Sequence, residues 1–425
     1  MSDISCGVDF GTSNSTIAYY RGERLTLVPV ENRHTTIPSA LFFERISNAP
    51  HYGREAVDLF LEREKGRFMR SLKRVLGTSV MKQGTMVNGA PMHFNKIIGQ
   101  FIQHLKNKAE THAQQEIESV IMGRPVHFID NDPVGNRNAQ EELRIIAQNV
   151  GFKNIDFQFE PIAAAFAHEV HVTGEKLALV VDIGGGTSDF TVIRLSNQYL
   201  HKADRSGDIL ANTGVRIGGN DFDKDLSLNA FMPELGYRST YGDKNLPVPL
   251  KFYYDLSEWS KINSLYTPKN LMLLRQYLGQ SHDKTRFSRL INVFTQESGH
   301  ILLGVVEDTK IALTSDDVHH APLDFIENGF TVETTKAVFE DSIAQEINNV
   351  ATAATQCVQD AGVSPASIDL IILTGGSTEI PAVQLKFKEL FPNATVSDEN
   401  KLDSVGVGLA YDSKRKFLGE VTLAR

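Results

Sequence analysis

The stretch VVDIGGGTSDF, residues 180–190, places three consecutive glycines, a threonine and an aspartate directly after an apolar run. The run before the glycines, LALVVDI (177–183), is almost continuously apolar, which is typical of a strand covered on both faces. After the glycines the apolar pattern resumes as FTVIRL (190–195). This pattern predicts two strands joined by a tight glycine turn.

A second stretch, CGVDFGTSNST (6–16), repeats this design. Asp9 corresponds to Asp182, and the turn at Gly11 corresponds to the run of three glycines. An apolar stretch, TIAYY (16–20), again follows. A lone glycine-rich turn is usually only a turn, but two copies with matching aspartate, glycine and threonine positions favour a shared function.

The residue types in both turns suit a metal-bound polyphosphate. Glycine lets the backbone approach a ligand closely, and successive N–H groups in a turn form a concavity that binds anions. Threonine and serine hydroxyls add donors, and an aspartate at the strand end suits Mg²⁺, usually through coordinated water. The sequence has neither the Gly-Lys-Ser/Thr of a Walker loop nor a Gly-x-Gly-x-x-Gly that opens a helix, which excludes those two classes of nucleotide site.

The composition is that of an ordinary soluble globular protein. Its 425 residues are 41% hydrophobic and 22% charged, and this length suits more than one domain or a two-lobed body. The formal net charge of -9, without a dense Lys/Arg block, argues against nucleic acid or an anionic membrane as the main partner. The two cysteines are far apart and no signal or membrane-spanning pattern occurs, so we expect a cytoplasmic protein.

Apolar runs that predict strands alternate with periodic stretches that predict helices, which indicates an α/β architecture. We predict further strands over 120–128 and 370–376, and helices over 97–105, 139–152 and 335–360. Residues 235–300 carry a mixed polar and aromatic pattern with the single tryptophan, Trp259, and we interpret them as a peripheral subdomain. The neighbouring histidines His319 and His320 have no metal-ligand spacing and are expected in a loop.

Four more motifs complete the set: Glu-Pro-Ile-Ala-Ala-Ala (160–165), Gly-Gly-Asn-Asp-Phe-Asp (218–223), Gly-Gly-Ser-Thr-Glu-Ile-Pro (375–381) and Ser-Leu-Lys-Arg-Val-Leu-Gly (71–77). Together with the two hairpins, and in the order in which they occur along the chain, they resemble the nucleotide-binding domain of DnaK-type heat shock protein 70 chaperones. That family belongs to the actin and sugar-kinase superfamily. The resemblance extends from Asp9 to Tyr411 and is closest to the short members of the family.

The resemblance implies an actin-like, ribonuclease H-like ATPase fold with two lobes around a cleft for ATP or ADP with Mg²⁺. Asp9 and Asp182 would hold the hydrated Mg²⁺. Lys73 would reach the γ-phosphate and the attacking water, while Glu160 and Asp189 would order the metal waters and the nucleophile. The phosphates would be cradled by Gly11, Thr12, Ser13, Asn14, Gly184, Gly185, Gly186 and Thr187. The nucleoside would be contacted by Gly219, Glu307, Lys310, Thr314, Gly375, Gly376, Ser377 and Asp403.

The resemblance also implies how the chain divides into lobes. We expect residues 1–171 in lobe I, 172–398 in lobe II with an inserted subdomain at about 224–305, and 399–425 as a helix returning to lobe I. At some positions, however, the sequence departs from the family pattern. Ile311 and Glu379 stand where the family often has arginines beside adenine. The segment between Gly219 and Lys310 is longer than in the full-length chaperones. The family's binding of nucleotide-exchange factors is therefore not expected to apply to this chain. The chain ends about a helix past Asp403, so we expect no peptide-binding domain in the family's manner.

Four functions remain open on the sequence. The first is a slow Mg²⁺-dependent ATPase of chaperone type, which opens and closes with nucleotide state. The second is a filament-forming actin-like ATPase, which the chaperone-like forms of residues 218–223 and 375–378 disfavour. The third is a sugar or acid kinase, for which no additional general-base aspartate stands in a recognisable motif. The fourth is a nucleotide-binding scaffold with little turnover, which the changes at Ile311 and Glu379 leave open. Clients and co-chaperones are unknown.

Overall fold

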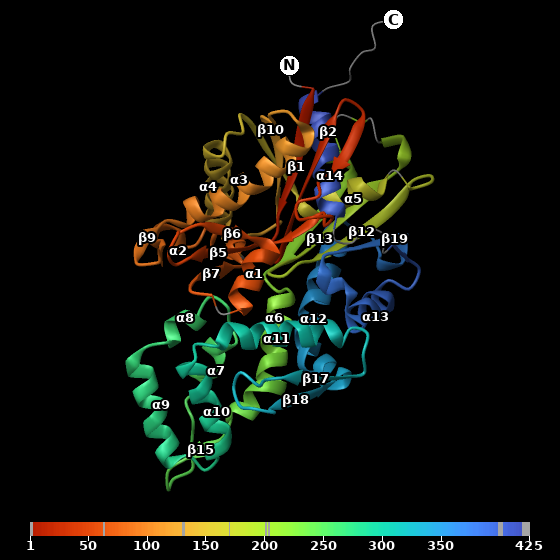
Figure 1. The fold of residues 1–425 in the computed structure, drawn as a ribbon. Coiled ribbons are helices and arrows are strands. Elements are labelled where there is room, and N and C mark those ends of the chain that lie inside the picture. The colour runs from red at the N-terminus through yellow and green to blue at the C-terminus, as the bar shows by residue number, and fades with distance from the viewer. Residues whose placement is uncertain are drawn as a thin grey trace, which may run out of the picture. The chain divides into compact units, whose positions relative to one another are not determined.

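The computed structural model describes residues 3–62, 64–129, 132–169, 171–199, 202, 205–397 and 403–418. The chain forms two compact units, which we describe separately. The larger unit comprises residues 1–218, 350–378 and 383–425, and the smaller one residues 219–349 and 379–382. Figure 1 shows the elements of both units with their labels.

The first sheet of the larger unit is built around the first glycine turn. β1 (Ile4–Phe10) and β2 (Asn14–Arg21) pair antiparallel, with Asp9 opposite Thr16. β3 (Arg24–Leu27) continues antiparallel beside β2, where β4 (Thr36–Pro38) also pairs. On the other side, β10 (Ser119–Arg124) and β11 (Asn154–Phe159) run parallel. The strand order is therefore β11-β10-β1-β2-β3.

The second sheet repeats this topology around the second glycine turn. β12 (Lys176–Ile183) and β13 (Ser188–Leu195) form the hairpin, and β14 (Ile209–Val215) adds antiparallel to β13. β19 (Leu370–Thr374) and β20 (Thr395–Ser397) add parallel beside β12. The order β14-β13-β12-β19-β20 corresponds to β3-β2-β1-β10-β11 of the first sheet, where β4 is an additional strand. The predicted internal repeat and actin-like α/β fold are confirmed.

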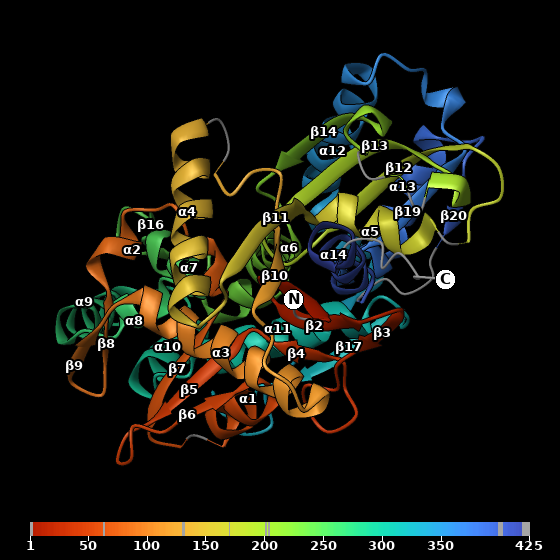
Figure 2. The ribbon, with the colours of Figure 1, turned by 90° about the horizontal axis from the view of Figure 1, so that it is seen from above.

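Two helices lie between the two sheets, as Figure 2 shows. α5 (Glu160–Glu169) packs against β12 and β13, and α14 (Ser404–Ser413) packs against α5, β1 and β2. The alanine run of α5 permits close packing of the two helices. A Cβ atom placed on Gly408 of α14 would lie only 1.6 Å from the carbonyl oxygen of Ala163 in α5.

The outer face of the first sheet is covered by α3 (Phe94–Ala113) and α4 (Pro133–Asn149), as Figure 2 also shows. The Asp132 side chain caps α4 by accepting a hydrogen bond from the Gly135 N–H at 2.8 Å, and Pro133 occupies the first turn, where a missing N–H costs nothing. These two signals start α4 six residues before the predicted helix 139–152. The strand predicted over 120–128 ends at Arg124, because Pro125 cannot donate to the ladder.

The larger unit also contains short elements. They are β5 (Ala40–Glu44), β6 (Pro50–Tyr52), α1 (Gly53–Leu61), β7 (Gly66–Arg70), α2 (Val80–Gln83), β8 (Thr85–Val87) and β9 (Ala90–Met92). Among them, β5, β6 and β7 form a three-stranded sheet, and β8 pairs with β9. α13 (Pro381–Leu390) follows β19 along the chain, and its Phe387 ring lies 6.3 Å from the Phe190 ring of the second sheet. Cys6 and Cys357 are buried free thiols.

The smaller unit is mostly helical. Its helices are α6 (Gly219–Leu226), α7 (Lys251–Leu256), α8 (Ile262–Leu265), α9 (Pro268–Gln280), α10 (Lys284–Thr295), α11 (Gly299–Ala312) and the first half of α12 (Lys336–Asp360). Its strands pair as two ribbons, β15 (Thr240–Tyr241) with β16 (Leu246–Pro247), and β17 (Val318–Pro322) with β18 (Thr331–Thr335). The expectation of a loop at His319 and His320 is wrong, because both lie within β17 and pair with β18.

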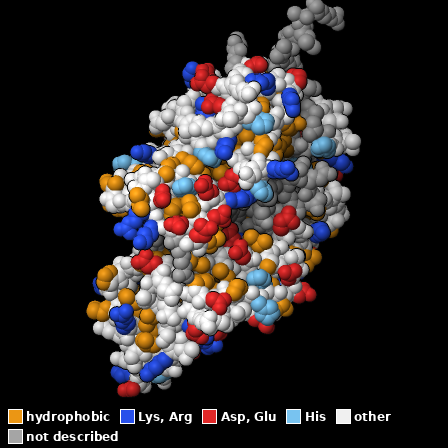
Figure 3. Space-filling view, in the orientation of Figure 1, with side chains coloured by type: hydrophobic (Ala, Val, Ile, Leu, Met, Phe, Trp, Pro, Cys, Tyr) orange, Lys and Arg blue, Asp and Glu red, His pale blue; other side chains and the backbone are white. Residues whose placement is uncertain are grey.

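Charged side chains of both signs are interspersed over the face drawn in Figure 3. Within the described ranges, no helix is long and apolar enough to cross a bilayer. The predicted C-terminal segment 399–425 includes α14 and the turn of helix at Lys414–Leu418; residues 399–402 and 419–425 lie outside the described residues.

Candidate active site

The two glycine turns meet at one pocket of the larger unit. A Cβ atom on Gly185 would lie 2.0 Å from the Ser13 Oγ, and one on Gly186 would lie 3.1 Å from the Thr12 Oγ1. Only glycine permits this approach of the second turn to the first. The pocket is lined by Asp9, Gly11, Thr12, Ser13, Asn14, Lys73, Glu160, Asp182, Gly184, Gly185, Thr187, Thr374, Gly375, Gly376 and Val405.

The enclosed space of this pocket is small and polar. Its volume is about 80 Å³, which is room for a few water molecules, a hydrated ion or a phosphate group. Most of the lining residues lie at or follow the carboxyl ends of β1, β12 and β19, and the others come from the start of α5, the 3₁₀ turn at Lys73 and α14. In α/β sheets, ligands bind at the carboxyl ends of the strands.

Lys73 and Glu160 form a buried ion pair in this pocket. Lys73 Nζ donates a hydrogen bond to Glu160 Oε1. Both side chains are less than a tenth exposed. Lys73 lies in a short 3₁₀ turn (Leu72–Val75), and the residue before that turn, Ser71, has a left-handed backbone conformation with φ of 57°. The turn is also held by Arg216, which donates to the Arg74 carbonyl at 3.0 Å.

Four carboxylates surround this single ammonium group. Burial, together with repulsion from Glu160, raises the pKa of Asp189 to about 7 and raises those of Asp9 and Asp182 as well. Burial opposes the charge on Lys73, but Glu160, Asp9 and Asp189 outweigh it and raise the pKa of the ammonium group. Four carboxylates outnumber the positive charges of Lys73 and the neighbouring Arg124, so buried negative charge is in excess when all are ionised. That excess favours binding of a cation.

The donor set fits a hydrated Mg²⁺. Carboxylate oxygens are the ligands that Mg²⁺ prefers, and it usually retains several waters. Among the residues the structure describes, no group of three or more His, Cys, Asp or Glu is close enough to hold a metal directly.

A third glycine turn, at Gly375 and Gly376, packs against the strand end that precedes the second turn. A Cβ atom on Gly375, whose φ is +83°, would lie 2.4 Å from the Ile183 carbonyl oxygen and 2.9 Å from Asp182 Oδ1. Ser377 Oγ lies 3.4 Å from the Gly184 carbonyl oxygen. Asp403 does not line the pocket. Its carboxylate accepts a hydrogen bond from Thr35 Oγ1 at 3.1 Å.

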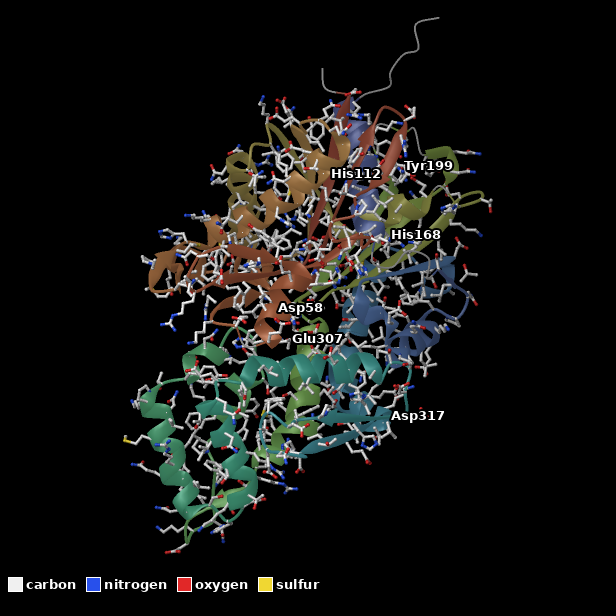
Figure 4. All side chains as sticks on the ribbon, in the orientation of Figure 1. Asp58, His112, His168, Tyr199, Glu307 and Asp317 are labelled. Carbon is white, nitrogen blue, oxygen red and sulfur yellow. The ribbon has the colours of Figure 1, made fainter. Side chains whose placement is uncertain are left out.

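The remaining predicted site residues belong to the smaller unit. Gly219 begins α6, and Glu307 and Lys310 lie on α11, where Figure 4 labels Glu307. Lys310 Nζ forms an ion pair with Asp223 Oδ1 of α6 at 2.8 Å. Thr314 follows the end of α11, and its hydroxyl donates to the Ile311 carbonyl at 2.7 Å.

The sequence model of the family described as Hsp70 protein matches residues 5–240 and 294–414. This is most of the chain. The chain belongs to the Hsp70 family. Hsp70 proteins are ATP-binding ATPases of chaperone type, and the matched residues include both glycine turns, Lys73 and Glu160. Residues 241–293 lie outside the match and inside the stretch 235–300 that the sequence pattern set apart.

Some site residues of this Hsp70 protein escaped sequence reasoning. Thr374 and Val405 line the pocket, and Thr374 Oγ1 lies 3.0 Å from Ser404 Oγ. Thr374 directly precedes the third glycine turn, so its position at a strand end was a usable signal. Val405 is an ordinary apolar residue on α14, and only the tertiary structure brings it to the pocket.

Proposed function

We propose that this Hsp70 protein binds ATP and ADP with Mg²⁺ at the pocket formed by the two glycine turns, and that it hydrolyses ATP slowly. The observation that carries the proposal is the convergence of both turns on the Lys73–Glu160 pair. Facing turns of N–H groups suit a chain of phosphates. By its resemblance to the family, we further propose that the protein changes conformation with nucleotide state.

The residues of the pocket divide the chemistry among them. Asp9 and Asp182 would hold a hydrated Mg²⁺, which would neutralise phosphate charge. The turn residues 11–14 and 184–187 bind and orient the phosphates. Lys73 supplies positive charge where negative charge develops, and Glu160 and Asp189 orient the attacking water and accept its proton. Phosphoryl transfer needs mainly such positioning and charge neutralisation.

The proposal predicts Mg²⁺-dependent phosphate release. Purified protein incubated with Mg-ATP is expected to release inorganic phosphate in proportion to protein concentration, and chelation with EDTA is expected to stop the release. The excess of buried carboxylates is the physical reason, because it favours a cation beside the phosphates. Phosphate release that continues unchanged in EDTA would contradict the assignment of Asp9 and Asp182.

A nucleotide-binding scaffold with little turnover is the second candidate. By family resemblance, Ile311 stands at a position where an arginine would stack on adenine, and Ile311 is 57% exposed. A stacked guanidinium is worth about 0.5–2 kcal/mol. A loss of that size weakens nucleotide binding and shortens the time available for hydrolysis.

Restoring an arginine at this position tests the nucleoside assignment. Ile311→Arg is expected to tighten ATP and ADP binding by about 2- to 30-fold, and the exposed position accepts the longer side chain without strain. Titration calorimetry measures the change. Val338→Arg, a substitution at another exposed aliphatic residue of the smaller unit, is the matched control. Equal affinities for both variants and the parent would remove Ile311 from the nucleoside site.

A further inference from the structure

Asp189 is held by a single backbone donor from the loop after β10. The Val126 N–H donates to Asp189 Oδ1 at 2.7 Å, and both residues are buried. This hydrogen bond favours the charged carboxylate, against the burial that disfavours it. Together with the side-chain hydrogen bond from Thr187, the Val126 N–H therefore fixes where the Asp189 carboxylate lies beside Glu160 and Lys73.

Arg124 controls the peptide unit that carries this N–H. Its Nε donates to the Pro125 carbonyl at 3.0 Å, and its Nη2 donates to the Val126 carbonyl at 3.1 Å. The Pro125 carbonyl and the Val126 N–H belong to the same planar peptide unit, in which they point in opposite directions. Arg124 thus holds one end of the unit while Asp189 accepts from the other. Hydrogen bonds in such a chain polarise one another.

The guanidinium of Arg124 is itself fixed on three sides. It lies 5.3 Å from the centre of the Phe128 ring and 4.9 Å from that of Phe159, and its Nη1 donates to Gln140 Oε1 of α4. The planar fork of an arginine, stacked between rings, loses little further freedom when it forms hydrogen bonds. Arg124 also attracts Glu160 and Asp189 electrostatically.

The next part of the loop has its own support. Asn136 Oδ1 accepts hydrogen bonds from the Phe128 and Ile129 N–H groups, and its Nδ2 donates to the Ile129 carbonyl. Loss of the Arg124 hydrogen bonds therefore leaves residues 128–129 anchored to α4. The Pro125–Val126 peptide and the Val126 carbonyl that follows it are the groups that lose hydrogen bonds from Arg124.

We propose that Arg124 is a positioning residue for ATP hydrolysis, which holds the Pro125–Val126 peptide so that the Val126 N–H fixes the Asp189 carboxylate beside Glu160 and Lys73. Arg124 acts through Asp189 and does not line the pocket. The inference rests on the proposed ATPase activity.

The test compares Arg124→Met and Arg124→Lys by steady-state phosphate release. Methionine keeps an apolar stem between the rings but removes the donors, so kcat is expected to fall by about 10- to 100-fold, with KM for ATP and the affinity for ADP within about twofold of the parent values. Lysine keeps the charge without the fork and is expected to give an intermediate kcat. The matched control is Arg144→Met. Arg144 stacks on Phe157 at 4.9 Å and donates to the Ile155 carbonyl, but contacts no site residue.

A double-mutant cycle with Asp189→Asn distinguishes an effect of Arg124 on the position of Asp189 from a general effect on the stability of the protein. If Arg124 acts through Asp189, Arg124→Met lowers kcat no further in the Asp189→Asn background. A parental kcat for Arg124→Met, full rescue by lysine, or an undiminished second loss in the cycle would overturn the inference while leaving the ATPase proposal intact. Absence of phosphate release by the parent protein would overturn both.

Discussion

Replacing Lys73 with alanine is expected to reduce phosphate release from ATP by at least about 100-fold, the usual cost of removing a preorganised electrostatic group from an active site. Lys73 is the cation that pairs with Glu160, and its charge faces Asp9 and Asp189 as well. Without it, negative charge that develops on the phosphates meets four carboxylates. ADP binding, measured by calorimetry, is expected to weaken far less than turnover, because the two glycine turns remain.

The control for Lys73→Ala must remove a buried lysine elsewhere. Lys106 is 4% exposed and pairs with Glu110 within α3. Loss of either lysine leaves a carboxylate without its partner and lowers stability. Lys106→Ala is therefore expected to lower the melting temperature but to keep the parental turnover of the folded enzyme. Equal turnover in Lys73→Ala and Lys106→Ala would remove Lys73 from the reaction.

Gly408→Ala is expected to destabilise the larger unit strongly. The added methyl group would occupy a point 1.6 Å from the Ala163 carbonyl oxygen, and neither helix backbone can move away without opening the layer between the two sheets. Overpacking of this kind costs about 3 kcal/mol, which corresponds to a melting temperature lower by about 5–10 °C. Thermal unfolding followed by circular dichroism measures it.

The matched control, Gly304→Ala, is expected to change the melting temperature in the opposite direction. Gly304 lies within α11, and a Cβ atom there meets nothing within 4 Å. Alanine is a better helix former than glycine by about 1 kcal/mol, so Gly304→Ala is expected to raise the melting temperature. A lower melting temperature for both variants, or for neither, would show that the contact between α5 and α14 does not limit stability.

The sequence predicted the two sheets because their signals are local. Apolar strands and glycine turns lie within stretches of about fifteen residues, and two copies of one pattern predict two copies of one topology. The same locality predicted most of the pocket, since residues 11–14 and 184–187 follow strand ends directly. The motif that begins with Glu160 is likewise a short local stretch, and Glu160 begins α5.

Contacts between distant segments could not be predicted in this way. Lys73 and Glu160 are 87 positions apart, and nothing in either motif states that they form an ion pair. The packing of Gly408 on Ala163 depends on where α14 returns to the sheets. Arg124 looks like an ordinary strand-end arginine until its hydrogen bonds to the Pro125–Val126 peptide are seen.

The central claim is that the two glycine turns bind one nucleotide from both sides, and titration calorimetry with Mg-ADP tests it most directly. The parent protein is expected to bind one Mg-ADP. Gly185→Val, which fills the space beside Ser13, is expected to abolish that binding without unfolding the protein. Gly207→Val, at a position with nothing within 4 Å of an added Cβ, is expected to bind as the parent does. Parental affinity in Gly185→Val would contradict the account.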